Sequence, residues 1–261
     1  MKRLYRVLTL LLALILAGCS LPSISDLPVE IPGNPQLPSL DQLRDWGLPD
    51  LSGIANLPQI SELPALNVGD NAIVFAGPTE RKIALGERIP GTDIVLAAIT
   101  AEGAEFQIGG LRAVRALGDS LDFDGNWPNI AGVTYNLRLR VYLVSSDGVR
   151  TAGIHRLLVE NIAAQEQAVT PQGTTLKIPY VASVNRGGWL KGNGLGYVGT
   201  TDRGAEFSGL PAGDYPYRKV GDSLLWRGFL RSDIPIEYNM RVVLYNDATV
   251  QVAGIATLQL P

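Results

Sequence analysis

The chain contains two stretches, residues 72–160 and 173–261, that repeat one sequence pattern. Matching four-residue blocks recur at a spacing of 101 and then 103 residues: Gly103-Ala104-Glu105-Phe106 with Gly204-Ala205-Glu206-Phe207, and Gly118-Asp119-Ser120-Leu121 with Gly221-Asp222-Ser223-Leu224. At 103 residues Tyr135, Asn136 and Arg138 also match Tyr238, Asn239 and Arg241, and a shorter hairpin later restores 101. Such repetition indicates one duplicated unit, and about 90 residues can bury a hydrophobic core.

Each copy has the pattern of β-strands. Apolar and polar residues alternate from Tyr135 to Leu143, which is typical of a half-buried strand, and Asp147-Gly148 predicts a hairpin turn after it. Shorter strands are expected near 73–77, 93–100, 104–108 and 119–124, with counterparts in the second copy. Only the connector, residues 161–172, has helical composition, at Asn161 to Gln167. We therefore predict an all-β protein of two tandem antiparallel domains, each a sandwich or a small barrel.

The segment before the repeats, residues 19–71, differs from them in composition. It holds eight of the 17 prolines, and residues 20–71 carry seven acidic side chains against Arg44 alone. Proline disfavours regular helix and strand, so we expect an extended tether in which only Ser39 to Trp46 forms a short helix. Leucine or isoleucine precedes most of these prolines. This regularity leaves open whether the tether also lies along its own domains or a partner.

The first residues have the pattern of an export signal. Lys2, Arg3 and Arg6 precede an apolar run from Val7 to Ala17, which is shorter than the roughly 20 residues that span a bilayer. The run ends in Leu16-Ala17-Gly18-Cys19, which resembles the lipobox of bacterial lipoprotein precursors. This resemblance implies cleavage after residue 18, lipid on Cys19, and attachment to the cell membrane or, because Ser20 is not Asp, to the outer membrane.

Composition excludes several classes of function. One cysteine and one histidine exclude a disulfide framework and a multi-histidine metal centre, so we expect no cofactor and no metal. The net charge of −3 provides no basic surface for nucleic acid. His155, the single histidine, is expected to pack or to form a hydrogen bond on a strand.

Two polar motifs resemble functional sites but also fit a purely structural role. The Gly-Asp-Ser-Leu blocks at Ser120 and Ser223 resemble the motif of the GDSL esterases and lipases, whose serine is the nucleophile. Neither serine here is followed by the family's late Asp-x-x-His, and a serine without a base is a poor nucleophile, so a turn or bulge is the preferred interpretation. Asp122-Phe123-Asp124-Gly125-Asn126 offers oxygen ligands for calcium, but it occurs in one copy only, and a polar turn is favoured.

Candidate functional residues come from what the two copies share and where they differ. Glu105 and Glu206, with Arg138 and Arg241, occur in both copies and predict a structural charge pair in each. The second copy alone has a glycine-rich stretch from Arg186 to Tyr197 and an aromatic-basic turn from Asp214 to Lys219, which together predict a recognition edge. The candidate ligand-binding residues there are Trp189, Tyr197, Tyr215, Tyr217 and Arg218. The alternative is a wide turn with Trp189 folded onto the core.

These observations predict a lipid-anchored envelope protein that acts by binding or scaffolding without catalysis. Its expected partner, apart from the membrane, is another envelope protein or a cell-wall glycan. Two alternatives remain open: a structural accessory subunit of a membrane complex, and an envelope serine hydrolase using Ser120 or Ser223.

Overall fold

The computed structural model describes residues 57–170 and 172–261, and these residues form an almost entirely β structure, as the sequence predicts. A single 3₁₀ turn, η2 (Ile60–Glu62), precedes the strands. The first repeat contributes β1 (Ala72–Ala84), β2 (Val95–Thr100), β3 (Gly103–Ile108), β4 (Leu111–Arg115), β5 (Ser120–Asn126), β6 (Val133–Ser145) and β7 (Gly148–Glu160). The connector and second repeat contribute β8 (Gln165–Glu166), β9 (Thr174–Asn185), β10 (Gly196–Thr201), β11 (Gly204–Ser208), β12 (Tyr217–Arg218), β13 (Ser223–Arg231), β14 (Ile234–Tyr245) and β15 (Thr249–Leu260).

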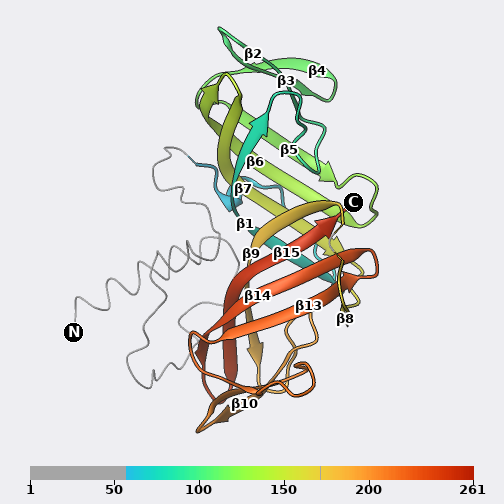
Figure 1. The fold of residues 1–261 in the computed structure, drawn as a ribbon, viewed down its shortest axis with the longest axis vertical. Coiled ribbons are helices and arrows are strands. Elements are labelled where there is room, and N and C mark those ends of the chain that lie inside the picture. Colours follow the sequence, from blue (N-terminus) through green and yellow to red (C-terminus); the bar gives the residue numbers. More distant parts are fainter. Residues whose placement is uncertain (1–56, 171) are drawn as a thin grey trace, which may run out of the picture.

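The two repeats have the same topology. A long antiparallel sheet in the order β1-β7-β6-β5 in the first repeat corresponds to β9-β15-β14-β13 in the second, where β8 adds a fifth strand. Each repeat also has a small three-stranded sheet, β2-β3-β4 or β10-β11-β12. The small sheets lie at opposite ends of the molecule, and the long sheets meet in the middle (Figure 1). All four sheets are open, so sheet packing rather than barrel closure builds this fold.

Alternation of buried and exposed side chains explains the long strands. In β6 the side chains of Tyr135, Leu137 and Leu139 are fully buried, while Arg138 and Arg140, which alternate with the buried residues, lie on the outer face. β5 and β7 pair with β6 on either side in unbroken antiparallel register over this stretch. The period-2 pattern in the sequence therefore gives each long sheet one apolar face and one polar face.

The strand register corrects one part of the sequence alignment between the repeats. A spacing of 103 residues equates Arg138 with Arg241. In the sheets, however, Ser120 lies opposite Arg140, and its equivalent Ser223 lies opposite Arg241. Arg241 therefore occupies the place of Arg140, and the spacing returns to 101 in the turn between β13 and β14 rather than in the hairpin after β14.

The two repeats share one hydrophobic core. The long sheets approach most closely where β1 and β9 cross, and a methyl group added at Gly77 would lie 2.6 Å from Pro179 Cγ. Phe75 of the first repeat packs against Tyr180 and Tyr238 of the second, with ring centroids 6.2 and 6.3 Å apart. The buried apolar side chains of both repeats form one continuous cluster. Each repeat consequently completes its core with side chains of the other.

The connector does not form the helix that its composition predicts. Gln165 and Glu166 instead form β8, which pairs with Phe229 and Gly228 of β13. The free edge of β13 offers backbone hydrogen bonds to the connector, and this tertiary pairing overrides local helix propensity. The helical prediction for this segment is therefore wrong.

The end of the tether contacts the first repeat. Pro58 and Leu63 are buried, the carboxylate of Glu62 lies 3.9 Å from the guanidinium of Arg140, and Arg156 donates a hydrogen bond of 2.5 Å to the carbonyl of Pro64. These contacts attach the last part of the tether to the outer face of the β5–β7 sheet.

The expectations for Cys19, the export signal and the short helix at residues 39–46 fall on residues outside those that the structure describes. Within residues 57–170 and 172–261, no helix is long and apolar enough to cross a bilayer.

Candidate functional site

Trp189 is the most exposed aromatic side chain of the second repeat. It bridges to Gly196 at the start of β10, and 61% of its surface is exposed. Its ring lies over backbone that lacks side chains, because a methyl group at Gly196 or Gly209 would come within 3.3 or 3.4 Å of ring atoms. The glycines therefore support one part of the indole while the rest of the ring faces solvent. The alternative, in which Trp189 folds onto the core, is wrong.

A shallow groove of about 430 Å³ runs beside Trp189. Its lining combines the indole and Val198 with backbone of Gly187 and Gly188 and the polar side chains of Arg186 and Ser208. The first repeat has an arginine, Arg88, at the position of Trp189, with the equivalent bridge to Val95. The exposed indole therefore belongs to the second repeat alone.

Tyr197 does not offer a stacking face, contrary to the sequence-based expectation. Only 1% of its surface is exposed, its ring packs 6.0 Å from that of Phe207, and its hydroxyl donates a hydrogen bond of 2.5 Å to the carbonyl of Asn246. Burial raises the pKa of its hydroxyl to about 12. Because side chains alternate along β10, Tyr197 points inward and supports the groove from below, while Val198 points outward.

The aromatic-basic turn forms a second, separate cluster. Tyr215 is 59% exposed and its ring packs edge-on against Tyr217, whose other contact is the Arg203 guanidinium, 4.0 Å from the ring centroid. Arg218 instead stabilises the turn, since it donates hydrogen bonds to the carbonyls of Ser223, Tyr215 and Tyr217. Tyr217 lies on β12, and β11 and β10 separate this strand from the segment of Trp189. The two clusters thus lie at different edges of the small sheet rather than on one edge.

The predicted charge pairs are not formed. Glu105 pairs with Arg112 at 2.8 Å across the β3–β4 hairpin, and Arg138 pairs with Asp124 at 2.7 Å across β5 and β6. In the second repeat Arg241 donates a hydrogen bond to the carbonyl of Gly221, and Glu206 has no ion pair among the described residues. The prediction fails because Glu105 lies on the small sheet and Arg138 on the long sheet.

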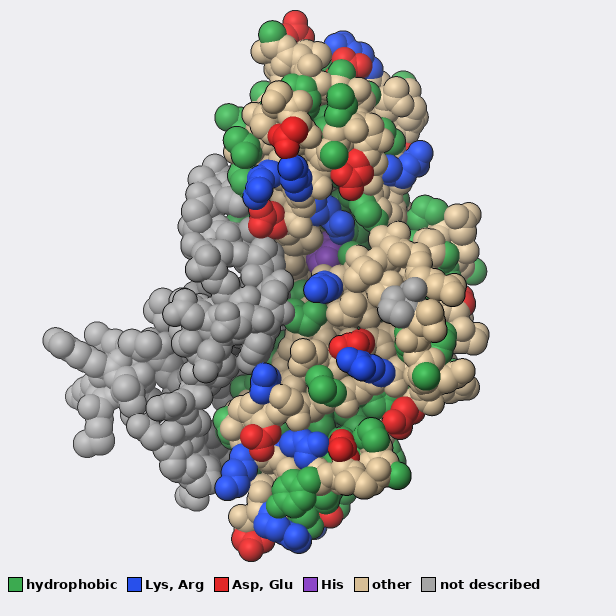
Figure 2. Space-filling view, in the orientation of Figure 1, with side chains coloured by type: hydrophobic (Ala, Val, Ile, Leu, Met, Phe, Trp, Pro, Cys, Tyr) green, Lys and Arg blue, Asp and Glu red, His purple; other side chains and the backbone are tan. Residues whose placement is uncertain are grey.

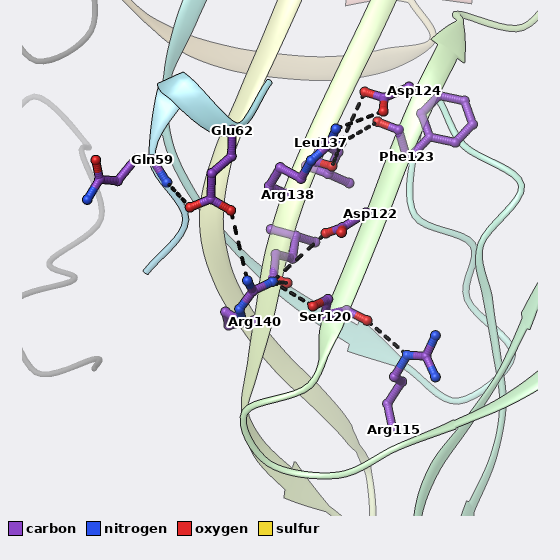
Figure 3. A network of polar contacts seen from close by, with 11 residues as sticks. Gln59, Glu62, Arg115, Ser120, Asp122, Phe123, Asp124, Leu137, Arg138 and Arg140 are labelled. Atoms are coloured by element: carbon purple, nitrogen blue, oxygen red, sulfur yellow. Dashed lines mark hydrogen bonds and ion pairs between the residues drawn. The ribbon is translucent and has the colours of Figure 1, made fainter. Parts of the chain in front are cut away.

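Instead, the outer face of the first repeat carries a network of arginines and carboxylates (Figure 3). Arg138 donates two hydrogen bonds to Asp124, and these bonds hold the pKa of that carboxyl below its usual value. Asp122 lies 4.0 Å from Arg140, and burial raises its pKa. Arg140 also contacts Glu62 of the tether. The acidic run at 122–126 lies within strand β5 and takes part in this network, so its interpretation as a polar turn is wrong. The described residues contain no cluster of three or more possible metal ligands.

The serine of the first Gly-Asp-Ser-Leu block takes part in the same network. The hydroxyl of Ser120 accepts a hydrogen bond of 2.7 Å from Arg140, on the outer face of the sheet. His155 lies on the inner face of that sheet, where it is 1% exposed. The two side chains therefore project from opposite faces and cannot act as a nucleophile and base.

His155 belongs to an inward-facing polar cluster that sequence reasoning did not identify. Arg81 donates a hydrogen bond of 2.8 Å to the hydroxyl of Tyr135, and that hydroxyl lies 3.4 Å from His155 Nδ1. Burial, with a smaller contribution from the charge of Arg81, lowers the pKa of His155 to about 3. The sequence position of Arg81 could have indicated this cluster. Arg81 lies an even number of residues after Phe75 on β1, so its side chain points to the same inner face.

Comparison with known proteins adds no relative to this picture. No protein-family model matches the sequence, and no curated protein and no solved structure matches it either.

Proposed function

We propose that this chain is a lipid-anchored protein of the bacterial envelope that acts by binding, without catalysis. The lipobox-like Leu16-Ala17-Gly18-Cys19 supports the location, and the acidic, proline-rich tether supports display of the repeats away from a membrane surface. The opposite orientation of Ser120 and His155 argues against the serine-hydrolase alternative for the first repeat.

The groove beside Trp189 is the proposed ligand surface, and the exposure of this indole is the observation that carries the proposal. Exposing a large aromatic ring to water is unfavourable, whereas a sugar ring or an apolar side chain stacked on it would remove apolar area from solvent. The polar groups of Arg186 and Ser208 beside the indole suit the hydroxyl groups of a glycan. We therefore favour a cell-wall glycan as the ligand.

Binding to purified cell-wall sacculi tests this surface. Trp189→Ala should weaken co-sedimentation by roughly tenfold or more, as expected for loss of an aromatic anchor. Leu225→Ala provides the matched control, because Leu225 is also about half-exposed but lies on β13, and it should leave binding unchanged. Equal binding by both variants would show that the groove is not the glycan site. Specific capture of one envelope protein that depends on Trp189 would replace the glycan with a protein ligand.

The anchor and the absence of hydrolysis have separate tests. Cys19→Ala should move the protein from the membrane fraction to the soluble fraction, and the intact mass of the natural chain should show lipid on residue 19. A serine-directed phosphonate probe should leave Ser120 and Ser223 unmodified. Stoichiometric labelling of either serine would overturn the non-catalytic proposal.

A further inference from the structure

A second hollow lies between the two repeats, at the crossing of β1 and β9. It has a volume of about 420 Å³ and is lined by Thr79, Arg81 and His155 of the first repeat and by Thr175 and Lys177 of the second, among others. Figure 2 shows this hollow between the upper and lower halves of the molecule, with the histidine colour at its floor. This cleft is distinct from the groove beside Trp189.

The hydrogen bonds around Arg81 and His155, at the bottom of the cleft, determine which atoms can still bind a ligand. Because a guanidinium only donates, the Tyr135 oxygen accepts from Arg81, and its own proton is free to point at His155 Nδ1, 3.4 Å away. This arrangement favours the tautomer in which Nδ1 accepts and the proton of the neutral imidazole is on Nε2. His155 Nε2 and Arg81 Nε are both buried donors without a partner among the described residues.

The charges at the cleft are predominantly positive. Neither Arg81 nor Lys177 has a carboxylate within 4.0 Å in the described parts of the chain. Glu80 is the one acidic residue of the lining, and it is already engaged by Arg150 at 3.5 Å and by the hydroxyl of Tyr142. A buried donor without an acceptor is unfavourable, so a ligand oxygen atom in the cleft would complete the hydrogen bonding of both groups.

The other repeat shows that the fold does not require these polar groups. At the equivalent crossing position, Tyr180 replaces Thr79, Ala182 replaces Arg81 and Ala256 replaces His155. Tyr180 fills the space with an aromatic ring, and its hydroxyl donates a hydrogen bond of 3.0 Å to the carbonyl of Lys191. One of the two equivalent positions is therefore filled by an aromatic ring, beside which the buried Tyr238 hydroxyl also lacks a partner among the described residues. The other position is open and carries the charged Arg81 and the polar His155.

We propose that the cleft between the repeats is a binding site for a small oxyanion, the carboxylate or phosphate group of a ligand. Arg81 and Lys177 supply the positive charge, and Arg81 Nε and His155 Nε2 donate hydrogen bonds to the anion's oxygen atoms. The neutral imidazole contributes a hydrogen bond rather than a charge. This site is independent of the Trp189 groove and of the proposed function.

The single histidine makes the proposal directly testable by NMR. In the chain labelled with ¹⁵N-histidine, titration with sodium phosphate and separately with sodium acetate should shift the His155 Nε2 resonance along a saturable curve. Sodium chloride at matched ionic strength should not do so. Saturation with only one of the two anions would identify the oxyanion class, and a linear response to both up to about 100 mM would overturn the proposal.

Substitutions of the residues that line the cleft test whether the anion binds there. Arg81→Gln should weaken binding by roughly tenfold or more, because it removes the charge and leaves a polar side chain. Arg112→Gln is the matched control, since Arg112 is 62% exposed on the small sheet, and it should leave the curve unchanged. Lys177→Gln is a second variant, for use if Arg81→Gln does not fold, because Lys177 is exposed and its substitution should not disturb the fold. Lys177→Gln should weaken binding about threefold. Unchanged saturation in both Arg81→Gln and Lys177→Gln would overturn the assignment.

Discussion

The inward faces of the paired strands β1 and β7 in the first repeat and of β9 and β15 in the second occupy equivalent places, but their side chains differ in chemistry. In the first repeat Arg81 and His155 bring charge and hydrogen-bond donors to the junction, whereas Ala182 and Ala256 of the second leave it apolar. The backbone register is the same in both, since Gly77 opposes His155 as Ile178 opposes Ala256. The second repeat shows that apolar side chains are sufficient to pack this junction. Packing therefore does not explain why the first repeat has polar residues there.

The largest effect is expected where the repeats exchange aromatic packing. Phe75→Ala should lower the free energy of unfolding by about 3–5 kcal/mol, because Phe75 is 1% exposed and packs on rings of the second repeat. Unfolding in denaturant, followed by tryptophan fluorescence and by circular dichroism, should remain a single transition. Leu111→Ala, at an exposed position, should change stability by less than about 0.5 kcal/mol. Two separate transitions in the natural protein would contradict a shared core.

The difference between His155 and Ala256 should appear as a dependence of stability on pH. His155 titrates at about 3 when folded and near 6.5 when unfolded, so its contribution is complete above pH 6.5 and is lost as the pH falls toward 3. The slope amounts to about 1.4 kcal/mol per pH unit in that window. His155→Gln should remove this part of the slope, measured by denaturant unfolding at several pH values. Identical slopes in both proteins would show that the imidazole is not buried in its neutral form.

A smaller effect is expected at the backbone crossing itself. Gly77→Ala should destabilise the protein by about 1–3 kcal/mol, since the added methyl group would lie 2.6 Å from Pro179 Cγ. Gly69→Ala is the matched control, because nothing lies within 4 Å of a methyl group there. Thermal unfolding of the two variants would measure the difference, and equal midpoints would refute the close approach of β1 to β9.

The smallest effect concerns the tether, which contacts the first repeat. Glu62→Gln should reduce stability by about 0–1 kcal/mol, because the Glu62–Arg140 pair is partly exposed and 3.9 Å apart. The loss should disappear in high salt. Arg241→Gln is the control, because Arg241 is the equivalent arginine of the second repeat. The effect of Arg241→Gln on stability should not change with salt as the effect of Glu62→Gln does. A salt-independent loss in Glu62→Gln would mean that the contact is not electrostatic.

The all-β class and the long hairpins were predictable from the sequence because they depend on local alternation and turn chemistry. The Asp147-Gly148 turn joins β6 to β7 as expected. β4 was missed because, as an edge strand, it has no alternating pattern, and Leu111 at its start is 75% exposed. The connector was misassigned because its pairing partner, β13, lies far along the chain.

The candidate site was predictable only in part. Unusual glycine content beside Trp189 indicated an exposed ring, but the inward direction of Tyr197 depends on the parity of β10, which the glycine-rich stretch obscures. The cleft at Arg81 could not be predicted, since it exists only where β1 crosses a strand of the other repeat. Neither repeat alone contains it.

The core shared by the two repeats affects when the protein can fold during its synthesis. The first half emerges from the ribosome with Phe75 and its neighbours uncovered, because the packing partners Tyr180 and Tyr238 are encoded roughly 100 and 160 residues later. A nascent chain of this kind stays incompletely folded until synthesis is nearly finished, which would suit the export that we propose, through a channel that accepts only unfolded polypeptide. During that interval its apolar surface is exposed to aggregation, and a chaperone that shields β1 would protect the step at which the protein is most vulnerable.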